Sequence, residues 1–223
     1  MWRSTPQDAE ANGMALTRLL SRTHYQLLTR AYVTASSMQQ VKQYPLETWT
    51  AGDGTVITIR PISADDLELK KAFAEGLSAN TVYQRLMSVR RPSLEELRRF
   101  TDLDSEREFA LIATTPVQGR ERQIGVARYV KDVTPTDAEF AIVLNDDWQR
   151  RGLGTRLLGS LLAAAKSDGV QRLVGTTMSD NDGMLKLGRR LGFRLDKEPG
   201  TASITNMTAD LSGKQPGGTA VVG

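Results

Sequence analysis

A glycine-rich segment, residues 149–155, combines residue types that suit the binding of an anion. It reads Gln-Arg-Arg-Gly-Leu-Gly-Thr and precedes a long amphipathic stretch, so Gly152 and Gly154 lie where a turn enters a helix. Glycine lets the backbone turn tightly and approach a ligand, and a helix N-terminus offers unpaired N–H groups and a positive dipole end. The segment therefore suits a pyrophosphate. It is not a P-loop, and a turn that only links a strand to a helix is the alternative.

Glu139 is the second residue whose position suggests chemistry. A strand is predicted over residues 138–144, in which Glu139, Ala141 and Val143 share one face. A carboxylate among small apolar side chains can serve as a general base. A solvent-facing glutamate at the strand end is the alternative. Asp146 and Asp147 are the nearest other carboxylates, and both are predicted to lie in the polar loop after the strand.

The rarest residue types exclude several kinds of chemistry. The chain of 223 residues has no cysteine and one histidine, His24. A thiolate zinc site, a cysteine-ligated iron–sulfur cluster, a cysteine nucleophile and a multi-histidine metal site are therefore excluded. We expect no metal cofactor, and acid–base work falls to Asp, Glu, Lys or Tyr.

The charge pattern gives no strong basic field. There are 29 Lys and Arg residues against 26 Asp and Glu, a formal net charge of +3. The arginines between Arg85 and Arg99 form either a solvated helix surface or a binding face for an anionic partner. We expect no nucleic-acid or membrane partner. A cytoplasmic location is also expected, because the start of the chain lacks a secretory signal and no stretch is apolar enough to span a membrane.

Three parts are predicted along the chain: a helical N-terminal appendage at 1–54, an α/β domain at 55–211 and a disordered tail at 212–223. Capping boxes at Ser63–Asp66 and Ser93–Glu96 are predicted to open two helices. Two further helices are predicted after residue 152 and over 182–191. Strands are predicted over 56–59, 109–114, 123–131, 138–144, 171–178, 193–197 and 203–208. This order predicts a mixed sheet with flanking helices.

Two runs of sequence carry a family resemblance. The run AEFAIVLNDDWQRRGLGTRLLGSLLAAA resembles the coenzyme-A-binding signature of the GNAT superfamily of N-acetyltransferases, and SDNDGMLKLGRRLGF resembles its second motif. The element order agrees over residues 55–210. The resemblance implies an α/β GNAT-like fold: a mixed, mostly antiparallel sheet flanked by helices and splayed at the acetyl-CoA site.

The resemblance also implies roles for individual residues. Backbone N–H groups from Arg150 to Thr155 would hold the pyrophosphate of acetyl-CoA, the backbone of residues 142–144 would pair with the pantetheine arm, and Asn181 would hold the pantetheine or cap a helix. The implied cofactor-binding residues are Ile142, Val143, Leu144, Gln149, Arg150, Arg151, Gly152, Leu153, Gly154, Thr155 and Asn181. Glu139 matches the glutamate that acts as the base in many members. Gly188 replaces a tyrosine that often serves as the acid.

A narrower resemblance concerns the acceptor. The stretches YPLETWTAGDGTVITIRPISADD and SLEELRRFTDLDSEREFALIA resemble the acetyltransferase domain of bacterial protein lysine acetyltransferases that modify acyl-CoA synthetases. The implied function is acetyl-CoA-dependent acetylation of a protein lysine. A small-amine acetyltransferase and a catalytically silent acyl-CoA-binding module are the alternatives. The sequence leaves open the acceptor, the oligomeric state and the acyl chain length.

Overall fold

The structure, a computed structural model, describes residues 44, 46–86 and 90–213. Most of the predicted appendage, including His24, and most of the predicted tail lie outside the described residues.

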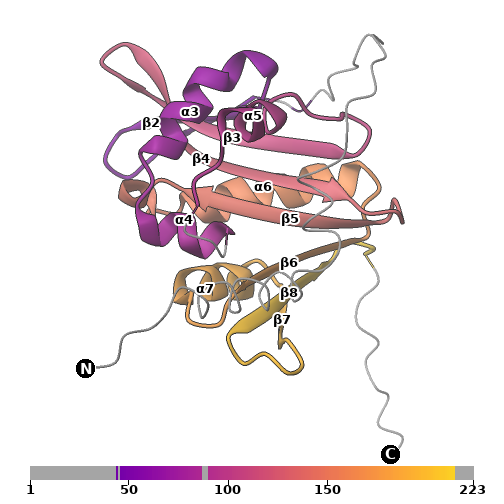
Figure 1. The fold of residues 1–223 in the computed structure, drawn as a ribbon. Helices are drawn as coiled ribbons and strands as arrows, with labels where there is room; N and C mark the ends of the chain where they lie inside the picture. Colours follow the sequence, from indigo (N-terminus) through magenta and orange to yellow (C-terminus); the bar gives the residue numbers. More distant parts are fainter. Residues whose placement is uncertain (1–43, 45, 87–89, 214–223) are drawn as a thin grey trace, which may run out of the picture. The chain divides into compact units, whose positions relative to one another are not determined.

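The described residues form one eight-stranded sheet (Figure 1). The strands are β1 Glu47–Thr50, β2 Val56–Pro61, β3 Glu108–Val117, β4 Arg120–Lys131, β5 Asp137–Leu144, β6 Arg172–Met178, β7 Arg194–Lys197 and β8 Ile204–Asp210. Their order in the sheet is β1-β2-β3-β4-β5-β6-β8-β7. Only the β5–β6 pair is parallel, and the other neighbours are antiparallel. The predicted mixed, mostly antiparallel sheet is confirmed.

The sheet begins before the predicted domain boundary at residue 55. Strand β1 pairs with β2 through Glu47↔Ile59 to Thr50↔Val56. The intervening turn is closed by a bond from the Gly54 N–H to the Ala51 carbonyl, 2.9 Å, and Gly54 has a φ of +84°. The turn residues therefore join two strands of one hairpin, whereas the predicted boundary treated them as the end of an appendage.

Helices cover both faces of the sheet. The helical elements are η1 Ala64–Asp66, α3 Leu67–Glu75, α4 Ala79–Leu86, α5 Leu94–Arg99, η2 Asp146–Trp148, α6 Leu153–Ser167 and α7 Asp182–Arg190. Phe73 of α3 and Val82 of α4 pack with Ile112 and Val126 on one face. Helices α6 and α7 pack on the larger apolar cluster of the other face. None of the helices in the described part is long and apolar enough to cross a membrane.

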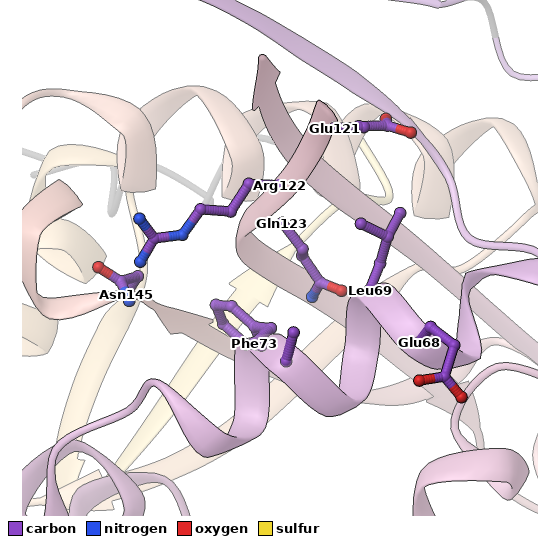
Figure 2. Close-up of a pocket in the computed structure, with 8 residues that line it drawn as sticks. Glu68, Leu69, Phe73, Glu121, Arg122, Gln123 and Asn145 are labelled. Atoms are coloured by element: carbon purple, nitrogen blue, oxygen red, sulfur yellow. The ribbon is translucent and has the colours of Figure 1, made fainter. Parts of the chain in front are cut away.

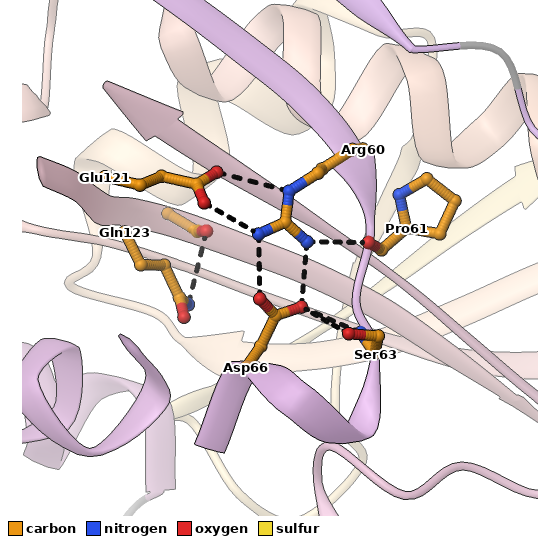
Figure 3. Close-up of polar contacts among 7 residues, drawn as sticks. Arg60, Pro61, Ser63, Asp66, Glu121 and Gln123 are labelled. Carbon is orange, nitrogen blue, oxygen red and sulfur yellow. Dashed lines mark hydrogen bonds and ion pairs between the residues drawn. The ribbon is translucent and has the colours of Figure 1, made fainter. Parts of the chain in front are cut away.

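Capping boxes mark the start of two helical elements on the face that α3, α4 and α5 cover. The Ser93 and Glu96 capping box opens α5 as predicted. The Ser63 and Asp66 box opens the short η1, and buried Asp66 is also held by Arg60 through contacts of 2.8 and 2.7 Å (Figure 3).

Helix α4 was not predicted. Its local signal is Ser78, whose hydroxyl accepts a bond from the Thr81 N–H, 3.1 Å.

Strands β5 and β6 separate where the family resemblance implies a splay. Their parallel pairing ends at Glu139↔Val174. Beyond that pair, β5 continues beside β4 and β6 continues beside β8. The ring of Phe140 occupies the vertex, because a Cβ on Gly175 would lie 2.6 Å from it. The Phe140 and Phe193 ring centroids are 5.0 Å apart. The predicted splayed sheet is confirmed, and its vertex lies next to Glu139.

Candidate active site

The turn before α6 presents backbone N–H groups at one end of this gap. Gly152 is the N-cap with a φ of +84°, and Arg150 has a φ of +59°. The N–H groups from Arg150 through Gly154 donate no hydrogen bond to another described residue. The Thr155 N–H differs, since it bonds to the Gly152 carbonyl at 3.1 Å. A turn of this kind at a helix N-terminus fits a pyrophosphate, with Thr155 contributing less than predicted.

The two glycines of the turn have different functions. Gly152 requires glycine for its left-handed backbone, and a Cβ there would meet no atom within 4 Å. Gly154 is buried, and a Cβ would lie 3.3 Å from Leu144 and 3.4 Å from Leu187. Gly154 therefore lets α6 pack closely on β5 and α7. Whether its missing side chain also leaves room for a ligand stays a prediction.

The backbone of β5 also offers groups to the gap. The Asn145 N–H bonds to the Ile124 carbonyl of the β4 side at 2.9 Å. Backbone groups alternate along an antiparallel strand, so those of Ile142 and Leu144 point away from β4 and toward the gap. Those of Val143 point toward β4, and its side chain packs on the α3 face. Of the predicted pantetheine-binding residues, Ile142 and Leu144 have the suitable orientation.

Glu139 lies on the face covered by α3, α4 and α5. It stands opposite Val130 of β4 and Val174 of β6, and it is half-buried. Helix α4 packs across β5 and β6, and its Arg85 lies within electrostatic range of Glu139. Burial lowers the pKa of Arg85, and the negative charge of Glu139 partly offsets that effect. The predicted apolar surroundings of Glu139 are therefore incomplete, because α4 brings a cation to it.

Further charged groups lie on the same face. Arg128 and Arg99 both bind the buried Glu108 carboxylate, Arg128 at 3.1 Å. The Arg128 guanidinium also lies 5.0 Å from the centroid of the Phe100 ring. Lys70 is 8% exposed and lies 5.9 Å from that same centroid. Burial, with the nearby charges of Arg128 and Arg85, lowers the pKa of Lys70 to about 7.

The other predicted site residues support the scaffold. Gln149 donates to the Thr81 hydroxyl at 3.2 Å and to the Leu144 carbonyl at 3.5 Å, so its side chain joins α4 to β5. Asn181 caps α7 by accepting from the Met184 N–H at 3.1 Å. Arg151 pairs with Asp53 at 3.2 Å.

Asp146 is not placed to act as a base. It accepts bonds from the Ser78 N–H at 3.0 Å, the Ser78 hydroxyl at 2.7 Å and the Thr81 hydroxyl at 2.7 Å. Burial raises the pKa of Asp146, but these hydrogen bonds outweigh it and the net pKa is lowered. Among the residues that the structure covers, no group of three or more His, Asp or Glu side chains could hold a metal.

A comparison with protein families decides the assignment. Residues 57–194, more than half of the chain, match the family described as acetyltransferase (GNAT) domain. The chain belongs to this GNAT family. Its GNAT domain contains both the predicted turn before α6 and the splayed strands, so the predicted enzyme class and fold are confirmed.

Individual relatives of the GNAT domain agree. It is 34% identical over 135 residues to "Acetyltransferase Pat" of Mycolicibacterium smegmatis, a match that spans 60% of this chain and 40% of that protein. The GNAT domain of S. lividans PAT superposes with a TM-score of 0.67 at 26% identity and covers 75% of this chain and 99% of that one. The fold of yncA from Salmonella typhimurium, solved with acetyl-CoA, has a TM-score of 0.57 at 18% identity and covers 71% of this chain and 95% of that one.

Several arginines of the arginine run make contacts within the GNAT domain. Arg90 binds Glu96 through two contacts of 2.8 and 2.7 Å. Arg91 donates to the Leu77 carbonyl at 2.8 Å, and Arg99 binds Glu108. These contacts connect α3, α5 and β3, whereas Arg98 of the same run is exposed.

The packing around Gly188 accounts for the glycine that stands where the second motif often has a tyrosine. It is buried in α7, where a Cβ would lie 2.4 Å from the tip of the buried Met207 and 3.3 Å from Leu195. With Met207 and Leu195 as they lie here, α7 leaves no free space for a side chain at this position.

Replacing Lys70 with methionine is expected to stabilise the GNAT domain. The pKa of Lys70 is about 10 in the unfolded chain and about 7 in the folded chain. The unfolded state therefore binds more protons between these values, so the Lys70 penalty is full below pH 7 and shrinks as pH rises. Lys70→Met should raise the free energy of unfolding by about 2–4 kcal/mol at pH 7.

Denaturant unfolding between pH 6 and pH about 10 measures this effect. Lys71→Met is the control, since Lys71 is exposed on the same helix. The gain from Lys70→Met should shrink toward the alkaline end. A loss of stability at neutral pH would contradict the assignment of Lys70 as an amine whose burial costs stability.

Proposed function

We propose that this GNAT domain transfers the acetyl group of acetyl-CoA to the side-chain amine of a lysine on a folded protein, such as an acyl-CoA synthetase. The observation that carries the proposal is the gap between β5 and β6, which opens beside Glu139 and ends at the turn before α6. The gap thus joins an anion-binding turn to a carboxylate. The likeness to Pat supports a protein acceptor, although the match spans 40% of that protein.

Binding is assigned to backbone groups. The N–H groups from Arg150 through Gly154 would hold the pyrophosphate, and the backbone of Ile142 and Leu144 would pair with the pantetheine arm. An N–H aimed at the thioester carbonyl oxygen would stabilise the charge that develops there, by about 3–4 kcal/mol for one such donor. The vertex at Phe140 would set how deep the arm inserts.

Glu139 would remove the proton that prevents attack. A lysine amine has an ordinary pKa of about 10.4 and is protonated near neutral pH. Once Glu139 accepts a proton, the neutral amine nitrogen attacks the thioester carbon and the C–N bond forms. The nitrogen loses its second proton to solvent as the C–S bond breaks. The coenzyme leaves as a thiolate, which solvent protonates because Gly188 offers no acid.

The charges around Glu139 favour a lysine over a polyamine. Lys70, Arg85 and Arg128 lie on its face, and Arg85 interacts electrostatically with Glu139. A small molecule with several ammonium groups would be repelled by the two arginines, whereas a single lysine side chain brings one charge, which Glu139 offsets.

The test is acetyl-group counting by mass spectrometry. The protein is incubated with acetyl-CoA and purified acyl-CoA synthetases, and in parallel with free amino acids and polyamines. A gain of one acetyl group on a synthetase lysine, lost when that lysine is changed to arginine, is expected. Acetylation of the free amines alone would replace the proposal with the small-amine function. No acetylation of any acceptor, despite acetyl-CoA binding, would favour the silent binding module.

A further inference from the structure

A second pocket lies between α3 and the start of β4, apart from the acetyl-CoA gap. It holds about 230 Å³, which is smaller than the clefts of roughly 300–1,000 Å³ that take drug-sized ligands. Leu69, Ala72 and Phe73 of α3 form its apolar wall (Figure 2). Arg122, Gln123 and Asn145 supply its polar side. The size suits a ligand no larger than an amino acid.

The side-chain oxygen of Gln123, which lines this pocket, lacks a hydrogen-bond donor. Its side chain is 2% exposed, and its Oε1 is the one buried side-chain polar atom among the described residues without a hydrogen-bond partner. The amide nitrogen donates to the Gly125 carbonyl at 3.4 Å, which fixes the direction of the oxygen (Figure 3). A buried acceptor without a partner is costly, so this atom calls for an N–H or O–H donor.

A β-bulge aims Gln123 at the pocket. The β3–β4 register shifts between Ala113 and Thr114, so that Ala113 opposes Gly125 and Thr114 opposes Gln123. Ala127 and Tyr129, further along β4, face the α6 side. In an unbroken strand, residue 123 would share the face of residues 127 and 129, and the bulge at Ile124 places Gln123 on the α3 face instead. Bulges that re-aim a side chain are frequent next to functional sites.

The charged groups of the pocket define the rest of the ligand. Arg122 is exposed and extends toward Asn145, where a planar guanidinium suits a carboxylate (Figure 2). Glu68 and Glu121 lie on the lining and favour a cationic donor over a hydroxyl. Glu121 also binds Arg60 at 3.2 and 3.1 Å. A carboxylate at one end, an ammonium near Gln123 and a hydrocarbon body between them are the features of an apolar α-amino acid.

The pocket is separate from the acceptor site but joined to the acetyl-CoA turn. Six residues of extended chain, about 20 Å, separate Glu139 from Asn145 at the pocket. An amine bound in the pocket is therefore out of reach of Glu139. The Asn145 side chain accepts from the Asp147 N–H at 3.2 Å. Asp146 and Gln149, which follow, both bind Thr81 of α4. The pocket wall therefore continues directly into the turn before α6.

We propose that the pocket between α3 and β4 binds an apolar α-amino acid, held by Gln123 and Arg122. Binding there fills the apolar wall of α3 and supplies the donor that Gln123 lacks. Because Asn145 lines the pocket and residues 145–149 lead from it to the acetyl-CoA turn, the amino acid should also change the affinity for acetyl-CoA.

Calorimetry tests the proposal with L-leucine as the probe. Wild-type protein should bind L-leucine with a Kd of about 0.1–1 mM. The affinity should fall about tenfold or more in Gln123→Met and in Arg122→Gln. Arg120→Gln is the matched control, an exposed arginine of the same strand outside the pocket, and should bind as wild type. Gln123→Met should also raise the melting temperature, because the unpaired acceptor is removed.

Two related probes separate the parts of the ligand. 4-Methylpentanoate lacks the amine and isopentylamine lacks the carboxylate, and each should bind more weakly than L-leucine. The acetyl-CoA titration repeated with saturating L-leucine should give a changed Kd in wild type and an unchanged one in Gln123→Met. Absence of L-leucine binding to wild type, or equal binding to wild type and both pocket variants, would overturn the proposal.

Discussion

Replacing Glu139 with glutamine is expected to lower kcat by about 10²–10⁴ and to leave acetyl-CoA affinity nearly unchanged. The substitution keeps the size of the side chain and removes its capacity to accept a proton. Glu139 is half-buried at the last β5–β6 pair, so the neutral amide fits where the carboxylate was. The steady-state rate and the acetyl-CoA Kd are measured on the same preparation.

Two comparisons make this result specific to Glu139. Asp147→Asn removes an exposed carboxylate of η2, the short helical element after β5, and should keep wild-type kcat. Asp146→Asn should weaken the contacts to Ser78 and Thr81, so it is expected to lower stability more than kcat. Wild-type turnover in Glu139→Gln would remove the base assignment, and loss of acetyl-CoA binding would give Glu139 a structural role.

Gly152→Asp is expected to lower acetyl-CoA affinity by about 10- to 100-fold. The left-handed backbone of Gly152 is unfavourable for aspartate, so the turn is expected to distort. The adjacent N–H groups would then no longer point toward the same pyrophosphate. The added carboxylate also repels the phosphates. The fold should survive, because a Cβ at Gly152 meets no atom within 4 Å.

The same helix supplies the control for backbone strain. Gly169 follows the C-terminus of α6 with a φ of +79°, and a Cβ there also meets no atom within 4 Å. Gly169→Asp should lower stability while acetyl-CoA affinity stays at the wild-type level. Equal losses of affinity in both variants would show that strain in α6, and not the turn at Gly152, controls binding.

Local patterns predicted the parts of the site that are continuous in sequence. The alternation over residues 138–144 placed Glu139 on the face opposite to Phe140, and the structure agrees. The glycines, the apolar stripe and Gly169 placed α6, which ends at Ser167 with Gly169 left-handed just after it. The position of the splay came from the family resemblance and not from the pattern itself.

The parts that depend on contacts between distant segments were not predictable from the sequence. The arginines from Arg85 to Arg99 look alike in sequence, yet Arg85 lies near Glu139 while Arg90 binds Glu96. Gly152 and Gly154 also look equivalent, although one sets a backbone angle and the other a packing distance. Their different functions arise from the elements that pack around them.

The most direct test of the central claim is a crystal structure of the protein with coenzyme A. The account predicts the pantetheine arm between β5 and β6, beyond the Glu139↔Val174 pair, and pyrophosphate oxygens within hydrogen-bond distance of the N–H groups from Arg150 through Gly154. It also predicts that the thiol ends near Glu139. A coenzyme bound outside this gap, or one whose pyrophosphate does not contact the turn before α6, would contradict the account.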